Sequence, residues 1–188
     1  MQLTEIRIAG FGGQGVILSA MVIGKAASIY ENGYAALTQN FGPEARGGAA
    51  SAQVILSTSP ILYPYITQPD VLIVMSQEAY ARFAPELKPG GVLIVEEDLI
   101  QASSGENGVP VQGIPATRLA ESLGKRMVQN IVMVGFFAAV TGLVSVQALR
   151  QAVADSVPAN TRDLNLRAFQ TGYEYGANLR VAAPQTLG

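Results

Sequence analysis

The stretch IAGFGGQGV, residues 8–16, places glycines at positions 10, 12, 13 and 15 between an apolar segment and a long helix-like run. The apolar segment, 6–9, is predicted to be a strand, and 16–30 a helix that is buried on more than one side. A strand that ends in a glycine turn and opens onto a helix leaves backbone N–H groups free at the helix N-terminus. Such groups bind anions, phosphates above all. The stretch therefore predicts the first strand–helix unit of an α/β fold together with an anion-binding loop.

The rest of the chain alternates short strands with helices. Apolar runs at 71–75 and 92–95 are typical of strands covered on both faces, as in parallel sheets. Further strands are predicted at 34–38, 49–56 and 109–114, the last at a sheet edge because Pro110 interrupts it. Helices are predicted at 78–83, 115–123, 130–142, 146–154 and 164–179, with Ser145 as a cap and with Gly172 and Gly176 allowing a neighbour to pack closely.

This pattern predicts a three-layer α/β fold, a Rossmann-like open sheet that is mostly parallel, with the glycine-rich loop after its first strand. One domain is expected over 1–180, followed by a C-terminal tail over 181–188.

Composition excludes several classes of function. The chain of 188 residues has 12 basic and 14 acidic side chains, and a net charge of −2 gives no electrostatic footprint for nucleic acid. It has no cysteine and no histidine, which excludes Ser-His-Asp and Cys-His catalysis, thiolate or imidazole metal sites and cysteine-bound iron–sulfur clusters. A metal site made of oxygen ligands alone stays open. No signal peptide is visible, and the longest apolar run, 131–140, is far below the ~20 residues of a membrane span. We expect a cytoplasmic protein.

The glycine loop satisfies the G-x-G-x-x-G pattern of dinucleotide-binding proteins. An NAD site also needs an acidic residue at the end of the second strand, where this chain has Thr38 and Gln39; Glu31 lies before the strand. A nucleotide-hydrolysing P-loop needs Lys-Ser or Lys-Thr after the last glycine, and Val16 follows here. Both readings are disfavoured. It stays open whether the glycines serve only close packing, although Gln14 is well placed to bond a ligand or a facing loop.

A second polar, glycine-rich loop is predicted over 39–48, at the same carboxyl edge of the sheet, where open α/β folds bind ligands. Arg46 suits a phosphate or carboxylate, and Gly47 and Gly48 let a backbone or ligand approach closely. The alternative is that Glu44 and Arg46 form a surface ion pair of little consequence.

Other polar and aromatic residues are ambiguous. Asn130 heads the apolar helix, either as its N-cap or as a contact to a loop or ligand. Glu78, beside Gln77, is favoured as a helix-start residue. Tyr63 and Tyr65 are expected to pack in the core rather than to form an exposed aromatic contact.

Taken together, these motifs resemble the gamma subunit of 2-oxoacid:ferredoxin oxidoreductases. The resemblance rests on GFGGQG (10–15), GPEARGG (42–48), Tyr63-Pro64, the 70–77 stretch, PATRLA (115–120) and Asn130, and it covers 3–178. The combination of Thr38-Gln39, PEARGG (43–48) and the 114–118 stretch looks most like the 2-oxoglutarate branch, although the pyruvate, branched-chain and indolepyruvate enzymes have similar gamma domains. Phe41 stands where many members have tyrosine.

The resemblance implies an enzyme complex that converts a 2-oxoacid, coenzyme A and oxidised ferredoxin into acyl-CoA, carbon dioxide and reduced ferredoxin. Thiamine diphosphate, magnesium and iron–sulfur clusters would lie in partner alpha and beta subunits, with a ferredoxin-like delta subunit where one is present. This chain lacks cysteine and the Gly-Asp-Gly…Asn stretch that holds thiamine diphosphate, so no residue of it is expected to be catalytic.

For this chain the hypothesis is a share in a coenzyme A site. Its candidate residues come from the two loops and the apolar helix: Gly10, Gly12, Gly13, Gln14, Gly15, Glu44, Arg46, Gly47, Gly48 and Asn130. The rival hypothesis is a structural subunit, in which the same loops contact partner protein. Sequence does not separate the two.

Overall fold

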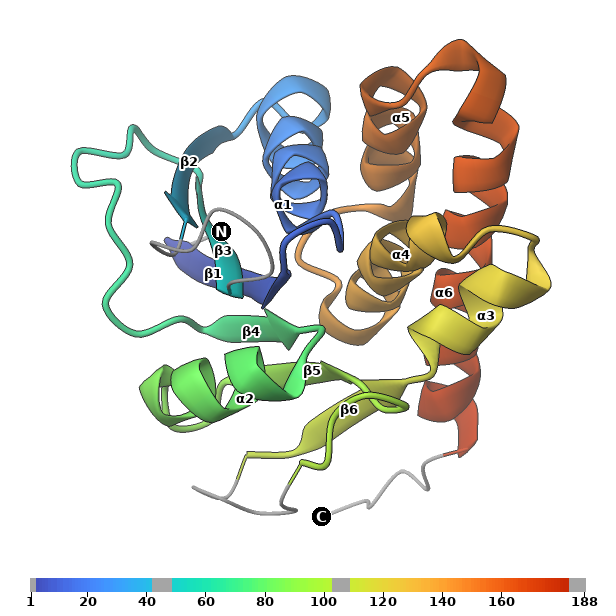
Figure 1. Ribbon diagram of the computed structural model, residues 1–188. Helices are drawn as coiled ribbons and strands as arrows, with labels where there is room; N and C mark the ends of the chain where they lie inside the picture. Colours follow the sequence, from blue (N-terminus) through green and yellow to red (C-terminus); the bar gives the residue numbers. More distant parts are fainter. Residues whose placement is uncertain (1–2, 42–48, 103–108, 183–188) are drawn as a thin grey trace.

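A single six-stranded sheet with helices on both faces organises the chain (Figure 1). The computed structural model describes residues 3–41, 49–102 and 109–182. The strands are β1 (Thr4–Phe11), β2 (Tyr34–Phe41), β3 (Ala49–Ser57), β4 (Val71–Val74), β5 (Val92–Glu96) and β6 (Val111–Ile114). Their order in the sheet is β2-β3-β1-β4-β5-β6.

The sheet is mixed, and one strand makes it so. β1, β4, β5 and β6 pair in parallel, whereas β3 runs antiparallel to both of its neighbours, β1 and β2. β2 therefore points the same way as β1, and five of the six strands share one direction. The prediction of a mostly parallel α/β sheet is confirmed. β6 lies at the edge of the sheet, as Pro110 indicated, although the strand begins only after that proline.

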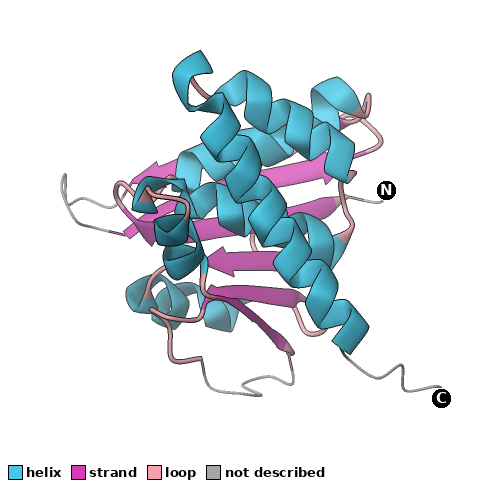
Figure 2. Cartoon of the chain, turned by 90° about the vertical axis from the view of Figure 1, so that its right-hand side faces the viewer, coloured by secondary structure: helices cyan, strands magenta, loops and turns pink. Residues whose placement is uncertain are grey.

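Two helical layers cover the sheet (Figure 2). The helices are α1 (Val16–Lys25), α2 (Gln77–Phe83), α3 (Ala116–Ser122), α4 (Gln129–Thr141), α5 (Val146–Ser156) and α6 (Arg162–Ala182). α2 covers one face and forms a small core with Leu72, Val74 and Leu93. The larger core lies on the other face, where α1 and α4 pack on the sheet and α5 and α6 on those helices. The three-layer prediction is therefore confirmed.

Glycines let α4 and α6 touch backbone to backbone. A Cβ added at Gly135 of α4 would stand 2.0 Å from the carbonyl oxygen of Phe169, and one at Gly172 of α6 1.9 Å from that of Val132. Every other residue type has a Cβ, so this crossing requires glycine in both helices. The expectation that Gly172 and Gly176 permit close packing is confirmed, with Gly135 as the partner that the sequence did not reveal.

Several boundaries differ from the predictions. β2 continues to Phe41, so Gln39 and Asn40 pair with β3 and do not begin the loop. The first helix closes with a π-helical turn, Ala26–Tyr30. The last helix reaches Ala182, two residues into the predicted tail, and 183–188 lie outside the described residues.

The expectation that Tyr63 and Tyr65 pack in the core is wrong. Their relative exposures are 66% and 60%, and Leu62 beside them is 94% exposed. The two rings lie 5.2 Å apart, centroid to centroid, on the segment between β3 and β4. Aromatic side chains prefer burial, so the pattern favoured the core, but this segment carries them on the surface.

Candidate functional site

The glycine loop joins β1 to α1 at the carboxyl edge of the sheet, and the Gln14 side chain holds it in place. Its Oε1 accepts from the backbone N–H of Phe11 at 2.6 Å, and its Nε2 donates to the carbonyl of Met75 at 2.8 Å. The amide thus ties the loop to the end of β4. A Cβ at Gly10 would stand 2.5 Å from this Oε1, so Gly10 makes room for the amide. Of the two roles considered for Gln14, the structure shows the bond to a facing segment.

Asn130 supports the loop from the opposite side. It lies in the first turn of α4, is 2% exposed, and donates through Nδ2 to the carbonyl of Gly15 at 3.3 Å. Its own carbonyl receives a long bond of 3.5 Å from Ser19 Oγ of α1. The N-cap reading of Asn130 is wrong, because α4 begins one residue earlier, at Gln129, with Val128 as its N-cap. Asn130 is a loop anchor.

Gly12 and Gly13 form the exposed tip of the loop. A Cβ added to either residue would meet no atom of the described chain within 4 Å. Gly13 has a φ of +91°, a conformation that favours glycine, whereas Gly12 has no such requirement. The fold of the described chain therefore explains Gly10, Gly13 and Gly15, but not Gly12.

The tip lies next to the start of α1. The N-cap of this helix is Gly15, with a φ of +75°, and no side chain caps the helix by a hydrogen bond. Uncapped N–H groups carry the partial positive charge of the helix dipole and suit an anion. The start of α1 thus lacks a side-chain cap at the place where the sequence predicts an anion-binding loop, and anion binding there stays a prediction.

The second predicted loop begins and ends beside the first. β3 starts at Ala49 opposite Phe11, and both Phe41 of β2 and Gly10 of β1 pair with Ala50. β2 therefore ends, and β3 begins, at the edge of the sheet where the glycine loop lies. The candidate residues Glu44, Arg46, Gly47 and Gly48 lie outside the described residues.

A buried polar cluster, which the sequence analysis missed, lies farther along the same edge. Glu96, 2% exposed at the end of β5, accepts through Oε2 from the backbone N–H of Thr117 at 2.7 Å and lies 3.0 Å from Thr117 Oγ1. That hydroxyl is 2.8 Å from Gln129 Oε1. Burial raises the pKa of Glu96, and the hydrogen bonds from the Thr117 and Asp98 backbones oppose part of that rise. An acidic run directly after an apolar strand, VLIVEED, was the available signal.

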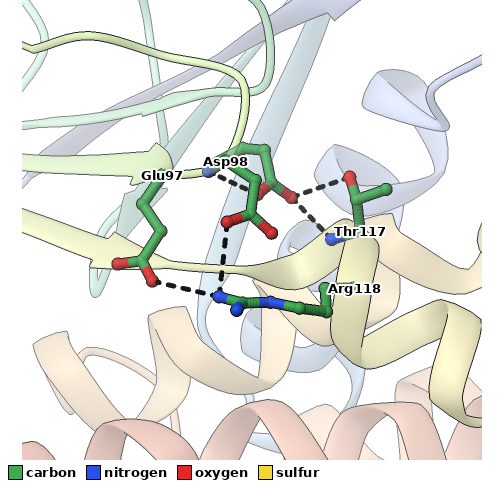
Figure 3. Close-up of polar contacts among 5 residues, drawn as sticks. Glu97, Asp98, Thr117 and Arg118 are labelled. Atoms are coloured by element: carbon green, nitrogen blue, oxygen red, sulfur yellow. Dashed lines mark hydrogen bonds and ion pairs between the residues drawn. The ribbon is translucent and has the colours of Figure 1, made fainter.

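An exposed ion cluster is adjacent in sequence to this buried one, because Glu97 and Asp98 follow Glu96 and Arg118 follows Thr117. Arg118, in the first turn of α3, lies 3.3 Å from Asp98 and 3.9 Å from Glu97 (Figure 3). Its side chain is 67% exposed, so these contacts contribute little to stability. The guanidinium of Arg118 is nevertheless paired with carboxylates of its own chain.

The residues on which an NAD site would depend make other contacts in the structure. Glu31 accepts from the backbone N–H of Ser145 at the start of α5, and Thr38 bonds to Gln53 on β3. β3 also separates β2 from β1, so the end of β2 is not the neighbour that an NAD ribose site uses.

Among the residues placed in the structure, no group of three or more acidic side chains could hold a metal ion. None of the helices described is long and apolar enough to cross a membrane.

The structure thus brings together Gly10, Gly12, Gly13, Gln14, Gly15 and Asn130. It also assigns ordinary structural roles elsewhere on the edge. Ser76 caps α2, and Gln77 accepts from the backbone N–H of Gln101.

Fold and site together define an α/β domain with a glycine-rich first loop, whose sequence has no histidine or cysteine for acid–base or nucleophilic catalysis. The chain belongs to the pyruvate ferredoxin/flavodoxin oxidoreductase family, whose model matches residues 5–175.

Individual relatives confirm the gamma-subunit resemblance. The 2-oxoglutarate synthase subunit KorC of Methanothermobacter thermautotrophicus is 48% identical over 90% of this chain and 93% of its own length. The protein of the same name from Methanocaldococcus jannaschii is 44% identical over 93% and 95%. The crystal structure of a keto/oxoacid ferredoxin oxidoreductase gamma subunit from Geobacter sulfurreducens is 37% identical, with a TM-score of 0.86 over 95% of this chain and 98% of that one.

A larger enzyme contains the same fold. The 2-oxoglutarate:ferredoxin oxidoreductase from Magnetococcus marinus, solved with 2-oxoglutarate, coenzyme A and succinyl-CoA bound, matches with a TM-score of 0.82 over 95% of this chain and 32% of that one. At 24% identity this likeness concerns the fold alone.

Proposed function

We propose that this chain is the non-catalytic gamma subunit of a cytoplasmic 2-oxoglutarate:ferredoxin oxidoreductase, in which it contributes to coenzyme A binding and to assembly. Alpha and beta subunits, with a ferredoxin-like delta subunit where one is present, carry thiamine diphosphate, magnesium and the iron–sulfur clusters. The absence of cysteine and histidine from the sequence supports that division of labour. The names of the two KorC relatives support the choice of oxoacid.

One observation carries the coenzyme A proposal. Gln14 and Asn130 hold the glycine loop rigidly from two sides, while its tip, Gly12 and Gly13, is exposed beside an uncapped helix start. Gly12 is not required by the described fold, so its lack of a side chain is best explained by a group that approaches from outside. The phosphates of coenzyme A fit this position because backbone N–H groups at a helix N-terminus bind anions.

A second observation favours the role in assembly. Leu62, Tyr63 and Tyr65 expose apolar surface on one short segment, and Met127 is 73% exposed elsewhere. Contiguous exposed apolar side chains mark contact surfaces in soluble proteins. A subunit that is buried in partners would carry such residues.

The test is coenzyme A binding by calorimetry on the complex with its co-purifying subunits. Gly13→Ala is compared with Gly124→Ala, because both glycines are exposed, both have a positive φ (+91° and +97°), and both have no described atom near the added Cβ. The two substitutions therefore impose similar backbone strain, about 1–2 kcal/mol. We expect Gly13→Ala to weaken coenzyme A binding about tenfold or more and Gly124→Ala to leave it unchanged.

Two further variants separate binding from scaffolding. Gly12→Ala adds a methyl group without strain in the described chain, and Arg46→Ala removes the predicted phosphate partner. Intact complexes with unchanged coenzyme A affinity in all three loop variants would contradict the binding role and favour a structural subunit. Loss of assembly in Gly12→Ala or Gly13→Ala would show that the loop contacts a partner subunit.

A further inference from the structure

The carboxyl group of Glu96 is buried without a cationic partner among the described residues that surround it. Arg118, the nearest cation on α3, pairs with Glu97 and Asp98. Glu96 instead receives hydrogen bonds from the backbone N–H groups of Thr117 and Asp98. A buried carboxyl group is costly to keep, so its contacts indicate what it holds in place.

The Thr117 hydroxyl links Glu96 to α4 through two hydrogen-bond contacts. The hydroxyl lies 3.0 Å from Glu96 Oε2 and 2.8 Å from the Gln129 amide, but it has a single proton. If Glu96 is ionised, Thr117 donates to it and accepts from the Nε2 of Gln129. If Glu96 carries a proton on Oε2, it donates that proton to Thr117, which then donates to the Oε1 of Gln129. The protonation state of Glu96 therefore sets the orientation of the Gln129 amide.

Gln129 is followed in the chain by the anchor of the glycine loop. Gln129 and Asn130 form the first turn of α4 and are 6% and 2% exposed. One contacts Thr117, and the other lies directly under Gly15. The first turn of the helix is thus held between the Glu96–Thr117 pair and the loop.

We propose that Glu96 is a positioning residue for the glycine loop. Through Thr117 it fixes Gln129 and with it the first turn of α4, so that Asn130 stays under Gly15. The Gly12–Gly13 tip keeps one conformation because Gly15 cannot shift away from this support. The contacts themselves do not depend on what the loop binds; only the consequence for coenzyme A rests on the proposed function.

The charged surroundings make this arrangement sensitive to pH. Asp98 and Glu97, on the loop after β5, are negative, and Arg118 on α3 is positive. Tyr175 of α6 interacts electrostatically with all three of these charges. The pKa of Glu96 is raised chiefly by burial and further by the charge of Asp98. The two hydrogen-bond arrangements therefore exchange at a higher pH than the titration of an ordinary glutamate.

The first experiment is hydrogen–deuterium exchange in the assembled complex, followed on the peptide that covers residues 10–16. Thr117→Val removes the relaying hydroxyl at nearly constant shape. Thr141→Val, at the far end of α4, is the control, since its hydroxyl also makes two bonds, to Phe137 and Leu143. We expect the loop to exchange about fivefold faster in Thr117→Val and in Asn130→Ala than in wild type. In Thr141→Val the exchange rate of the loop should equal that of wild type. Unchanged loop exchange in Thr117→Val overturns the proposal, whether or not Asn130→Ala has an effect.

The second experiment uses pH. Glu96→Gln cannot titrate, so the ratio of loop exchange between wild type and this variant should change with pH, after correction for intrinsic exchange. A ratio that is constant from pH 4 to pH 8 contradicts the role of Glu96.

Coenzyme A binding then separates this proposal from the proposed function. Faster loop exchange together with weaker binding in Thr117→Val supports both. Faster exchange with unchanged binding supports the positioning role of Glu96 and counts against the coenzyme A site.

Discussion

The Asn130 side chain occupies the space where any residue other than glycine at position 15 would place its Cβ. An added Cβ would stand 2.5 Å from Asn130 Nδ2 and 2.6 Å from its Cγ. The two residues are 115 positions apart, on the loop before α1 and in the first turn of α4. This contact joins the glycine loop to α4, of whose 13 residues 11 are buried.

Gly15→Ala should therefore destabilise the chain by about 3 kcal/mol, from steric overlap and from the positive φ of +75°. Asn130→Ala in the same chain should relieve the overlap with Nδ2 and Cγ, although the Cβ of residue 130 stays 3.0 Å away, and should leave the backbone strain of about 1–2 kcal/mol. A double-mutant cycle by urea denaturation measures the coupling. Additive effects of the two substitutions would show that the contact carries no strain.

Local patterns predicted the elements of the fold but not the order of all strands. The apolar runs of β4 and β5 and the glycine turn after β1 are signals carried by a few adjacent residues, and the structure confirms them. The insertion of β3 between β1 and β2 depends on pairing between distant segments, and its nine residues alone carry no mark of direction. That is why a mostly parallel sheet was predicted without its antiparallel strand.

In the candidate site, too, features formed by adjacent residues could be predicted, whereas contacts between distant segments could not. The glycine loop was visible because strand, turn and helix are contiguous, whereas the anchoring role of Asn130 depends on where α4 begins relative to a distant loop. Glu96 and Thr117 were missed because their hydrogen bonds join the end of β5 to the first turn of α3, and the two residues are 21 positions apart in the chain. Tyr63 and Tyr65 were assigned to the core because aromatic residues prefer it, and no local pattern reveals which aromatic segment lies on the surface.

Two helical glycines should respond in opposite ways to alanine. At Gly24 of α1 the added Cβ would lie 3.6 Å from Ala35 Cβ and Val54 Cγ1, an ordinary packing distance. Gly24→Ala should stabilise the chain by about 0.5–1 kcal/mol, because alanine loses less backbone entropy in a helix.

Gly172→Ala is the counterpart, since its Cβ would stand 1.9 Å from the carbonyl oxygen of Val132. Separating α4 from α6 should cost at least about 3 kcal/mol. Thermal unfolding followed by circular dichroism compares the two variants. A melting temperature that rises for both would contradict the close approach of these helices.

Glu96 should make stability depend on pH. Burial raises its folded-state pKa above the ordinary value of a glutamate, so the folded state binds its proton more tightly than the unfolded state does. The resulting stabilisation is complete below the unfolded pKa and is lost as pH rises through the folded pKa. The loss amounts to about 1.4 kcal/mol for each unit by which the pKa is raised.

Urea denaturation of wild type and Glu96→Gln at intervals from pH 4 to pH 8 measures this contribution. The unfolding free energy of wild type should fall relative to that of the variant as pH rises. A difference that stays constant would show that folding does not change the pKa of Glu96, and a change of the opposite sign would show that the folded protein favours the ionised carboxylate.

Removing either partner of the Arg7–Glu86 ion pair should have unequal effects. Arg7 lies on the central strand β1 with a side chain only 5% exposed, whereas that of Glu86 is 41% exposed. The guanidinium also lies 4.9 Å from the centre of the Phe83 ring, and its Nε has no hydrogen-bond partner among the described residues. Glu86→Ala leaves this buried charge unbalanced. The free energy of unfolding should fall by about 1–3 kcal/mol, less than for a fully buried pair because Glu86 is half-exposed.

Arg7→Met removes the charge, keeps apolar contact with Phe83 and lets Glu86 hydrate, so the loss of stability should stay within about 1 kcal/mol. Urea denaturation of both variants at neutral pH ranks the two costs, and the reverse order would mean that Arg7 contributes more through its own contacts than its buried charge costs.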